Sequence, residues 1–390
     1  MSDPIYLDYA ATTPVDPRVL EAMLPYFDGD FGNPSSLHHF GRRAEAALER
    51  ARRDVAEALH CLPREIIFTS CGSESDNLAL RGAALAAREG RGANHLITTP
   101  LEHSAVIATA RHLRDHFGFE LTELPVDRDG RVSPGDVARA IRPDTALVSV
   151  IYANNEIGTI SPIAEIAAAC SERHVPLHID AVQAASQLDL DVRKLGVSYM
   201  ALGAHKFYGP KGVGALFVRQ GSPLLPTQTG GSHEYGLRAG TQNVPYIVGL
   251  AEALKITVAE REKHNAHFRV LRDRLIEGLL RSIPECQLTG HRTERLPNHA
   301  SFVFRGVNGN DLLMHLDLAG IAASSGSACK TGDPEPSDVL LALGLPPEWA
   351  LGSLRLTVGR LTTEAHVDRV LEVLPGLIEK LRALELTPVV

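Results

Sequence analysis

The sequence predicts an α/β fold, with a large domain built on a mainly parallel seven-stranded sheet between helices and a smaller C-terminal α/β domain. Short apolar runs alternate with amphipathic helical segments through about the first two thirds of the chain, as in βαβ units. A long helical pattern then precedes a second group of strands. The 390 residues also exceed the size of one ordinary core, which favours two domains.

Seven apolar runs are the expected strands of the large domain. Most are apolar on both faces, which is typical of strands covered by helices on both sides. They span residues 65–70, 95–100, 120–126, 145–152, 175–180, 199–203 and 214–219. Amphipathic segments lie between them. In residues 42–60, for example, Ala44, Leu48 and Val55 recur at helical spacing.

A helical pattern from Val244 to Arg281 predicts one long helix, and we place a domain boundary near residue 258 inside it. The smaller domain is expected to contain strands over 299–305, 320–325 and 353–359 and a closing helix over 364–384. The predicted division of the chain is an N-terminal segment associated with the small domain, a large domain and a small C-terminal domain, at 1–15, 16–257 and 258–390.

Composition excludes several classes of protein. The net charge of -8 comes without a basic block, which argues against nucleic acid or an anionic membrane as the main partner. No basic and apolar leader opens the sequence, and no run approaches the roughly 18 apolar residues of a membrane span. The five cysteines are scattered without C-x-x-C pairs, so we expect neither disulfides nor a metal site, and we expect a cytoplasmic location.

Lys206 directly follows the expected strand 199–203, in the stretch "ALGAHKFYGPKG". Ligands of open α/β sheets bind outside the carboxyl ends of strands. A lysine that is partly removed from water has a lowered pKa, so its neutral amine is available to form a Schiff base. Taken alone, such a lysine is more often an ordinary surface residue. Asp180, at the end of a neighbouring apolar strand, changes the balance, because a buried carboxylate needs a partner.

Other strand ends add polar groups to the same rim. The turn after strand 65–70 leads into a helix and carries Ser73, an arrangement that suits a phosphate dianion. His103 and Asn155 follow two further strands. Each of these residues alone is more often a helix cap or a solvated side chain. Together with a lysine and an aspartate, they predict a site for pyridoxal 5'-phosphate (PLP).

The sequence resembles the NifS/IscS-type cysteine desulfurases, which are fold-type I PLP enzymes of the class V aminotransferase group. The resemblance covers nearly the whole chain and rests on ordered segments at similar spacing: "YLDYAATTP", "GNPSSLH", "SESDN", "EHSAV", "NNEIG", "DAVQA", "AHKFYGPKG", "LRAGTQNVP", "SSGSAC" and "LRLTVGR". The resemblance therefore implies a PLP-dependent transferase fold and a cysteine desulfurase activity.

The resemblance also implies a role for each matching residue. Lys206 binds PLP and moves the substrate proton, Asp180 holds the pyridine nitrogen, and Gln183 bonds the ring oxygen. His103 stacks on the ring and acts as acid or base. The phosphate is assigned to Gly72, Ser73 and His205, with Thr241 reaching in from the other subunit of a homodimer.

The substrate carboxylate is assigned, by the same resemblance, to Asn155 and Arg355, with help from Asn33. A guanidinium fork matches a carboxylate in shape. Cys329 is implied as the nucleophile, on a Gly-, Ser- and Pro-rich loop that is expected to be mobile. Its thiolate would take sulfur from L-cysteine, release L-alanine and pass the persulfide to acceptors for iron–sulfur cluster assembly or other sulfur transfer.

Some features depart from the family pattern. Gly203 stands where a serine usually contacts the phosphate, and Cys71 and Ser73 replace the commoner glycine and threonine. The chain ends at "LELTPVV", so the scaffold-docking tail of many members is not expected. Three alternatives remain at this point: a selenocysteine lyase, an ordinary class V aminotransferase, and a non-catalytic scaffold or sulfur-relay protein. The presence of both Lys206 and Cys329 argues against the last two.

Overall fold

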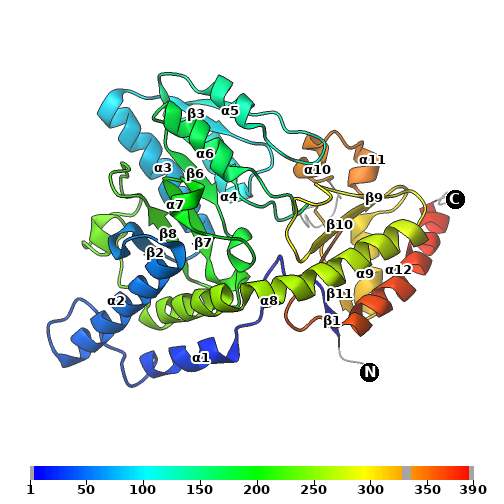
Figure 1. Cartoon of the computed structure of the whole chain (residues 1–390), viewed down its shortest axis with the longest axis horizontal. Helices are drawn as coiled ribbons and strands as arrows, with labels where there is room; N and C mark the ends of the chain where they lie inside the picture. The colour runs from blue at the N-terminus through cyan, green and yellow to red at the C-terminus, as the bar shows by residue number, and fades with distance from the viewer. Residues whose placement is uncertain (1–3, 327–334, 386–390) are drawn as a thin grey trace.

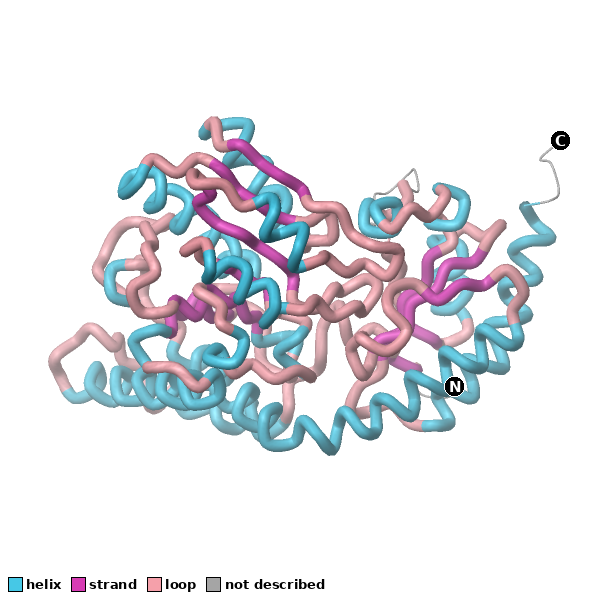
Figure 2. The backbone as a smooth tube through the Cα atoms, turned by 45° about the horizontal axis from the view of Figure 1, so that its top comes forward, coloured by secondary structure: helices cyan, strands magenta, loops and turns pink. Residues whose placement is uncertain are grey.

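Two groups of strands lie side by side along one long helix, as Figures 1 and 2 show. The structure is a computed structural model that describes residues 4–326 and 335–385. The long helix, α8 (Val244–Ser282), runs beneath both groups. It follows the predicted helical pattern to within a residue at its C-terminal end.

The larger group is a seven-stranded sheet in the order β2-β8-β7-β6-β5-β3-β4. Neighbouring strands are parallel, except that β8 is antiparallel to both β7 and β2. In chain order the strands are β2 (Ile66–Thr69), β3 (His95–Thr98), β4 (Glu120–Glu123), β5 (Thr145–Ile151), β6 (Leu177–Asp180), β7 (Tyr199–Gly203) and β8 (Gly214–Val218). The predicted mainly parallel sheet and all seven of its strands are confirmed. Every strand except the edge strand β4 is buried along its full length.

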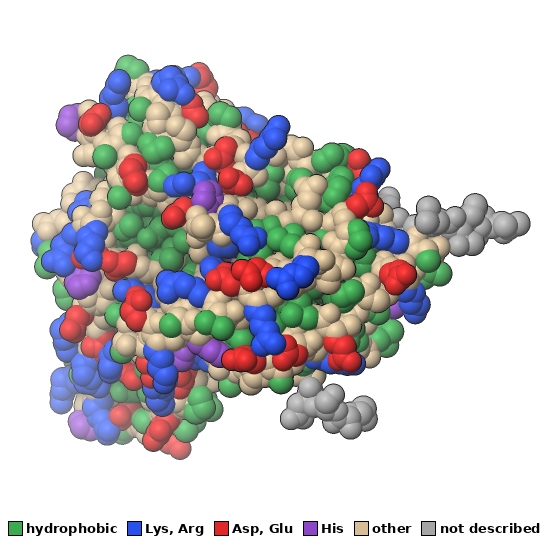
Figure 3. Space-filling view, turned by 45° about the vertical axis from the view of Figure 1, so that its right-hand side comes forward, with side chains coloured by type: hydrophobic (Ala, Val, Ile, Leu, Met, Phe, Trp, Pro, Cys, Tyr) green, Lys and Arg blue, Asp and Glu red, His purple; other side chains and the backbone are tan. Residues whose placement is uncertain are grey.

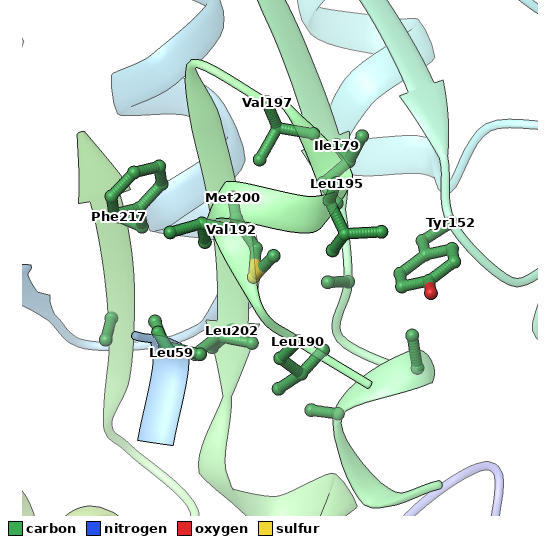
Figure 4. Close-up of a cluster of buried hydrophobic side chains, with 14 of the residues drawn as sticks. Leu59, Tyr152, Ile179, Leu190, Val192, Leu195, Val197, Met200, Leu202 and Phe217 are labelled. Atoms are coloured by element: carbon green, nitrogen blue, oxygen red, sulfur yellow. The ribbon is translucent and has the colours of Figure 1, made fainter. Parts of the chain in front are cut away.

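Helices cover both faces of this sheet (Figure 1). They are α1 (Pro17–Met23), α2 (His39–Leu59), α3 (Gly72–Arg91), α4 (Ser104–Phe117), α5 (Pro134–Ala140), α6 (Ile163–Glu172) and α7 (Val192–Leu195). Figure 4 shows part of the core, where Leu190, Val192 and Leu195 face Met200 and Leu202 of β7. Burial of such side chains contributes roughly 1.5–3 kcal/mol each, so the strand ends that carry the site rest on a well-packed base.

The smaller group is an antiparallel sheet in the order β12-β10-β9. Its strands are β9 (Cys286–Leu288), β10 (His299–Phe304) and β12 (Ser353–Thr357), and the helices beside them are α9 (Gly309–Leu318), α10 (Asp338–Ala342), α11 (Pro347–Ala350) and α12 (Glu364–Glu385). Strands near 299–305 and 353–359 and the closing helix were predicted. The strand predicted over 320–325 is limited to β11 (Ile321–Ala322), because Ser324 makes only an isolated bridge with Arg355.

The N-terminal segment joins the small unit. Its strand β1 (Ile5–Tyr6) pairs in parallel with β11, and Leu7 is buried in the same apolar cluster as the second half of α8. The first half of α8 contributes Leu250 and Leu254 to the core of the large sheet. These separate cores support the predicted division at 1–15, 16–257 and 258–390, which stays a prediction.

Charged side chains of both signs are interspersed over the face shown in Figure 3, without a large area of one sign. Among the described residues, no helix is long and apolar enough to cross a lipid bilayer.

A buried ion pair joins α2 to the loop that follows β8. The guanidinium of Arg52 donates to both carboxylate oxygens of Glu234, at 2.8 and 2.9 Å, and to the carbonyl of Ile66 at 2.6 Å. Glu234 also accepts a hydrogen bond from the amide of Phe68. Both charged side chains are almost fully enclosed, and Arg52 also pairs with the partly exposed Glu49 at 3.0 Å, so Glu234 is its buried counterion.

We predict that Glu234→Ala lowers the free energy of unfolding by about 3–5 kcal/mol, because Arg52 loses its only fully enclosed counterion among the described residues and keeps just the partly exposed carboxylate of Glu49. Equilibrium denaturation in guanidinium chloride measures this loss. Glu285→Ala is the control, since Glu285 forms an exposed pair with Arg305 and its removal should leave the denaturation midpoint unchanged. Equal midpoints for the two variants would contradict the assignment.

Candidate active site

A cavity of about 340 Å³ opens at the carboxyl ends of β5, β6 and β7. Parallel strands present their carboxyl ends at one edge of a sheet, where open α/β folds bind ligands. The predicted residues that line it are Gly72, Ser73, His103, Asn155, Asp180, Gln183, His205, Lys206 and Arg355. The structure thus brings together, at one edge, residues that lie up to 283 positions apart (355 − 72) in the sequence.

Lys206 lies in a single 3-10 turn directly after β7. Its amine donates to the carbonyls of Ala10 and Ala11, at 2.6 and 2.8 Å. Those two acceptors favour the ammonium form, but burial and then the positive charge of Arg355 oppose it, and together they lower the pKa of Lys206 to about 8. An amine with this pKa supplies a useful neutral fraction near neutral pH.

The N-terminal turn that holds Lys206 also fixes Gln183, whose side-chain amide donates to the carbonyl of Ala10 at 2.7 Å. The turn belongs to the segment that pairs with the small domain through β1. The position of the lysine amine therefore depends on how the two units are assembled.

Asp180 is the last residue of β6 and is 4% exposed. Its Oδ1 accepts a hydrogen bond from the amide of Val182 at 2.9 Å. Burial raises the pKa of Asp180, and the positive charges of His103 and Lys206 act in the opposite direction. A protonated ring nitrogen would supply the partner that this carboxylate needs.

The first turn of α3 forms another wall of the cavity. Gly72 approaches the turn after β6 so closely that a Cβ there would lie 2.6 Å from Cγ2 of Val182, so a larger residue does not fit without a shift. Ser73 is exposed on the same turn. Free backbone N–H groups at a helix N-terminus favour an anion, which suits the phosphate assigned to this end.

His205 completes this part of the wall. Its Nδ1 lies 3.2 Å from Oγ1 of Thr12. Burial, with smaller contributions from the charges of Lys206 and Lys211, lowers the pKa of His205 to about 4. His205 is therefore neutral near neutral pH and serves as a hydrogen-bonding group there.

Arg355 reaches the cavity from β12 of the small sheet. Its guanidinium donates to the backbone carbonyl of Asn155 at 2.9 Å and to a carboxylate oxygen of Asp8 at 3.0 Å. Its buried Nε has no hydrogen-bond partner within the described ranges. A guanidinium with an unused buried donor can take a further carboxylate, as the predicted substrate role requires.

His103 is the N-cap residue of α4 and is exposed at the mouth of the cavity, with its Nδ1 accepting from the amide of Ala105 at 3.1 Å. Asn33 and Thr241 are also exposed, but neither is among the described residues that line the cavity. Cys329 lies outside the described residues. The roles predicted for these side chains stay predictions.

Sequence reasoning missed several buried acids around the cavity. Asp8 pairs with Arg355, and Asp76 forms part of the cavity wall. Glu102 is buried and bonded to the amide of Ile151, and burial raises its pKa to about 8. These acids lie in the segments "YLDYAATTP", "SESDN" and "EHSAV". The sequence could have indicated them because each is an acidic residue beside a predicted strand end or helix start.

Glu156 was missed as well. Its pKa is raised to about 7, chiefly by burial, and its Oε2 accepts a hydrogen bond from Ser337. A Cβ at Gly326 would lie 2.7 Å from the same oxygen. Glu156 therefore lies against Gly326, the last described residue before the segment containing Cys329, and against Ser337, which follows that segment closely.

The donor set fits PLP. The cavity combines a lysine amine of lowered pKa, a buried carboxylate of raised pKa, and the glycine-lined start of a helix. Within the described residues, Asp76, His103 and Asp180 also lie near enough together, at up to 4.8 Å between ligand atoms, to hold a metal ion. We assign this place to the cofactor ring, because a lysine and an anion site adjoin it.

A larger hollow of about 620 Å³ lies at the opposite, amino-terminal edge of the sheet, with Arg91, Arg193 and Arg219 in its wall. Arg91 and Arg219 donate to backbone carbonyls, and Arg193 pairs with Asp191. None of the predicted site residues lines it.

We predict that, in cofactor-free protein, Lys206 reacts with an amine-directed reagent with a midpoint near pH 8, because the lowered pKa leaves its amine neutral above that pH. Ordinary lysines, with a pKa of about 10.4, react with a midpoint some two pH units higher. The low-pH phase should vanish in Lys206→Ala and persist in Lys255→Ala. If Lys206 reacted with the same midpoint pH as the exposed lysines, the prediction would be wrong.

Comparison with known proteins identifies the family of this chain. The aminotransferase class-V family matches residues 5–370. The cysteine desulfurase IscS of Methanosarcina thermophila is 49% identical, over 98% of this chain and 94% of that protein. A solved NifS-like protein superimposes with a TM-score of 0.87 at 36% identity, covering 98% and 99% of the two chains. SspA, solved in complex with cysteine, gives a TM-score of 0.78 at 35% identity, covering 91% and 98%. The chain belongs to the class-V aminotransferase family, among the cysteine desulfurases of the NifS/IscS type.

Proposed function

We propose that this protein is a PLP-dependent cysteine desulfurase, which converts L-cysteine to L-alanine and leaves the sulfur as a persulfide on Cys329. The observation that carries the proposal is the placement of Lys206, Asp180, the start of α3 and Arg355 around one cavity. Relatives that are cysteine desulfurases, 45–49% identical over nearly the whole chain, support the same activity.

Bound PLP would supply an aldehyde for covalent attachment and a ring that withdraws electrons from the substrate. The residues of this chain would hold it at both ends. Asp180 bonds the ring nitrogen, Gln183 bonds the ring oxygen, and His103 covers the ring. Gly72, Ser73 and His205 hold the phosphate, and Thr241 of the partner subunit completes that end.

Lys206 has two tasks in this proposal. Its neutral amine would hold the cofactor covalently, and the free amine would carry a proton to and from the substrate carbon. Burial keeps its pKa near the working pH, which favours proton transfer in both directions.

Arg355, with Asn155 beside it, would bind the substrate carboxylate. The arginine is already oriented by Asp8 and by the backbone carbonyl of Asn155, so little reorganisation is needed when substrate arrives. We assign Asn33 a supporting contact. The Cys329 thiolate would then attack the substrate sulfur: the new S–S bond would form as the substrate C–S bond breaks, the electron pair of that bond would stay with the substrate, and protonation would complete L-alanine while the sulfur remains on Cys329 as a persulfide.

The persulfide would pass to acceptor proteins, including those that assemble iron–sulfur clusters. We place the protein in the cytoplasm, where the free thiols of Cys61, Cys71, Cys170 and Cys286 remain reduced. The same architecture could serve selenocysteine, and the assay below compares the two substrates.

A homodimer is part of the proposal. Apolar side chains are exposed along the segment between α1 and α2, where Phe31 is 65% and Leu37 is 90% exposed. Phe31 also stacks on Phe40, which is itself exposed. Such a cluster favours a protein interface over open water. Thr241 is exposed and does not line the cavity of its own chain. This position is expected of a residue that binds the phosphate in the partner's cavity.

The activity is tested by measuring alanine formed from L-cysteine and from L-selenocysteine. The wild type should form alanine from cysteine with transfer of sulfur to an added thiol. Lys206→Ala and Cys329→Ser should each lose at least about 100-fold of the cysteine rate, because a nucleophile or proton carrier is removed. Cys286→Ser is the matched control and should keep full activity. Full turnover by Cys329→Ser would refute the assigned nucleophile, and a marked preference for selenocysteine would favour a lyase.

Gly203→Ser tests the phosphate end of the cavity. A Cβ at Gly203 would lie 3.4 Å from the amide nitrogen of Gly72 and from Cγ1 of Val182, which is ordinary contact, so a serine fits. Its hydroxyl would add one phosphate hydrogen bond and tighten PLP binding by roughly 2- to 12-fold. Absorbance titration of cofactor-free protein measures the dissociation constant. Gly203→Ala should match the wild type, and a serine variant no tighter than the alanine variant would contradict the prediction.

The dimer is tested with Phe31→Asp, which places a charge in the exposed apolar cluster. We expect sedimentation to show a dimer for the wild type and a shift toward monomer for the variant, with weaker PLP retention. Leu318→Asp, at an 85% exposed leucine on α9, is the control and should stay dimeric. A wild type that is fully active as a monomer would contradict the proposal.

A further inference from the structure

Asp76 is a second carboxylate in the wall that carries Asp180. It lies in the first turns of α3, lines the cavity and is 1% exposed. Ligand atoms of Asp76, Asp180 and His103 all lie within 4.8 Å of one another. The Oδ1 of Asp76 has no hydrogen-bond partner within residues 4–326 and 335–385. A buried carboxylate without a partner is costly when it is ionised.

The nearest side chain that could neutralise Asp76 is His178 of β6. Its Nε2 lies 3.4 Å from Oδ1 of Asp76, and its Nδ1 lies 2.8 Å from Oγ of Ser149 on β5. His178 is completely enclosed, and this burial lowers its pKa to about 3. The imidazole is therefore neutral, so it offers Asp76 a hydrogen bond but no positive charge.

Burial is the main cause that raises the pKa of Asp76 well above its usual value, and the acidic neighbours Asp180, Glu102 and Cys71 raise it further. His103 also lies within 4.8 Å of Asp76, but with Lys206 it acts to lower the pKa of Asp180. Two carboxylates at this separation in a dry site do not both ionise, and one proton is shared unequally between them.

We propose that Asp76 is a positioning residue of the coenzyme site, a neutral carboxylic acid whose O–H group donates to Nε2 of His178. His178 in turn donates from Nδ1 to Ser149, and a small rotation of the Asp76 side chain closes the 3.4 Å gap. The single negative charge of this wall then stays on Asp180, opposite the ring nitrogen. This inference rests on the proposed function for the identity of the ring, but the protonation state of Asp76 is a property of the protein itself.

Infrared spectroscopy tests the protonation state directly. In a chelator-treated sample, with and without PLP, we expect a carbonyl-stretching band of an un-ionised carboxylic acid near neutral pH, shifted in D₂O. The band should vanish in Asp76→Asn and remain in Asp180→Asn. Glu102→Gln identifies the separate band of Glu102, whose pKa is also raised. An identical neutral-acid spectrum in wild type and Asp76→Asn would overturn the proposal.

Cofactor binding tests the positioning role. Asparagine mimics a neutral acid in shape and polarity, so Asp76→Asn should bind PLP within about threefold of wild type. Asp76→Ala leaves His178 without its partner and should bind at least about tenfold more weakly. A loss in Asp76→Asn as large as in Asp76→Ala would show that the ionised carboxylate is required and would overturn the proposal.

Experiments can distinguish a failure of the proposed function from a failure of the assignment of Asp76 as a neutral acid. A wild-type protein that bound no PLP would refute the proposed function, but the infrared band of the cofactor-free protein would still report whether Asp76 is neutral. A wild type that bound PLP and lacked the Asp76 band would refute this inference and leave the proposed function standing.

Discussion

The site depends on one constraint, which is that a lysine amine is held out of water at the end of a buried strand. Lys206 follows β7, and its amine is bonded to the carbonyls of Ala10 and Ala11. These carbonyls belong to a segment that also pairs with β11. Without that N-terminal turn, the amine would be open to solvent and its pKa would return toward that of an ordinary lysine. The chemistry of the cavity therefore depends on tertiary assembly as much as on the strand itself.

The small unit contributes charge as well as shape. Arg355 enters from β12 and lowers the pKa of Lys206, while Asp8 and the carbonyl of Asn155 orient the guanidinium. The buried acids Asp76 and Glu102 lie near Asp180, and burial raises the pKa of each of them. Burial therefore limits how much negative charge this part of the cavity carries. A low-dielectric site of this kind strengthens the interaction of each remaining charge with a bound ligand.

Much of this arrangement could be predicted from the sequence, because apolar strands that end in polar residues must bring those residues to one edge of a parallel sheet. Lys206, Asp180 and His205 were found in this way or by family resemblance, and the cavity contains them. The acids Asp76, Glu102 and Glu156 were missed, since a buried acid looks like a solvated one until its neighbours are known. Strands as short as β1 and β9 have too few residues to show a period. The contact predicted between Thr241 and the cavity of another subunit cannot be seen in the structure of one chain.

We expect the amine of Lys206 to be covalently joined to PLP in the resting enzyme. This attachment can be measured by borohydride reduction of the PLP-loaded protein, followed by proteolysis and peptide mass spectrometry. The pyridoxyl phosphate mass should be found on the peptide containing Lys206, at one group per chain. A label spread over other lysines, such as Lys211, or absent from the Lys206 peptide, would show that Lys206 does not hold the cofactor.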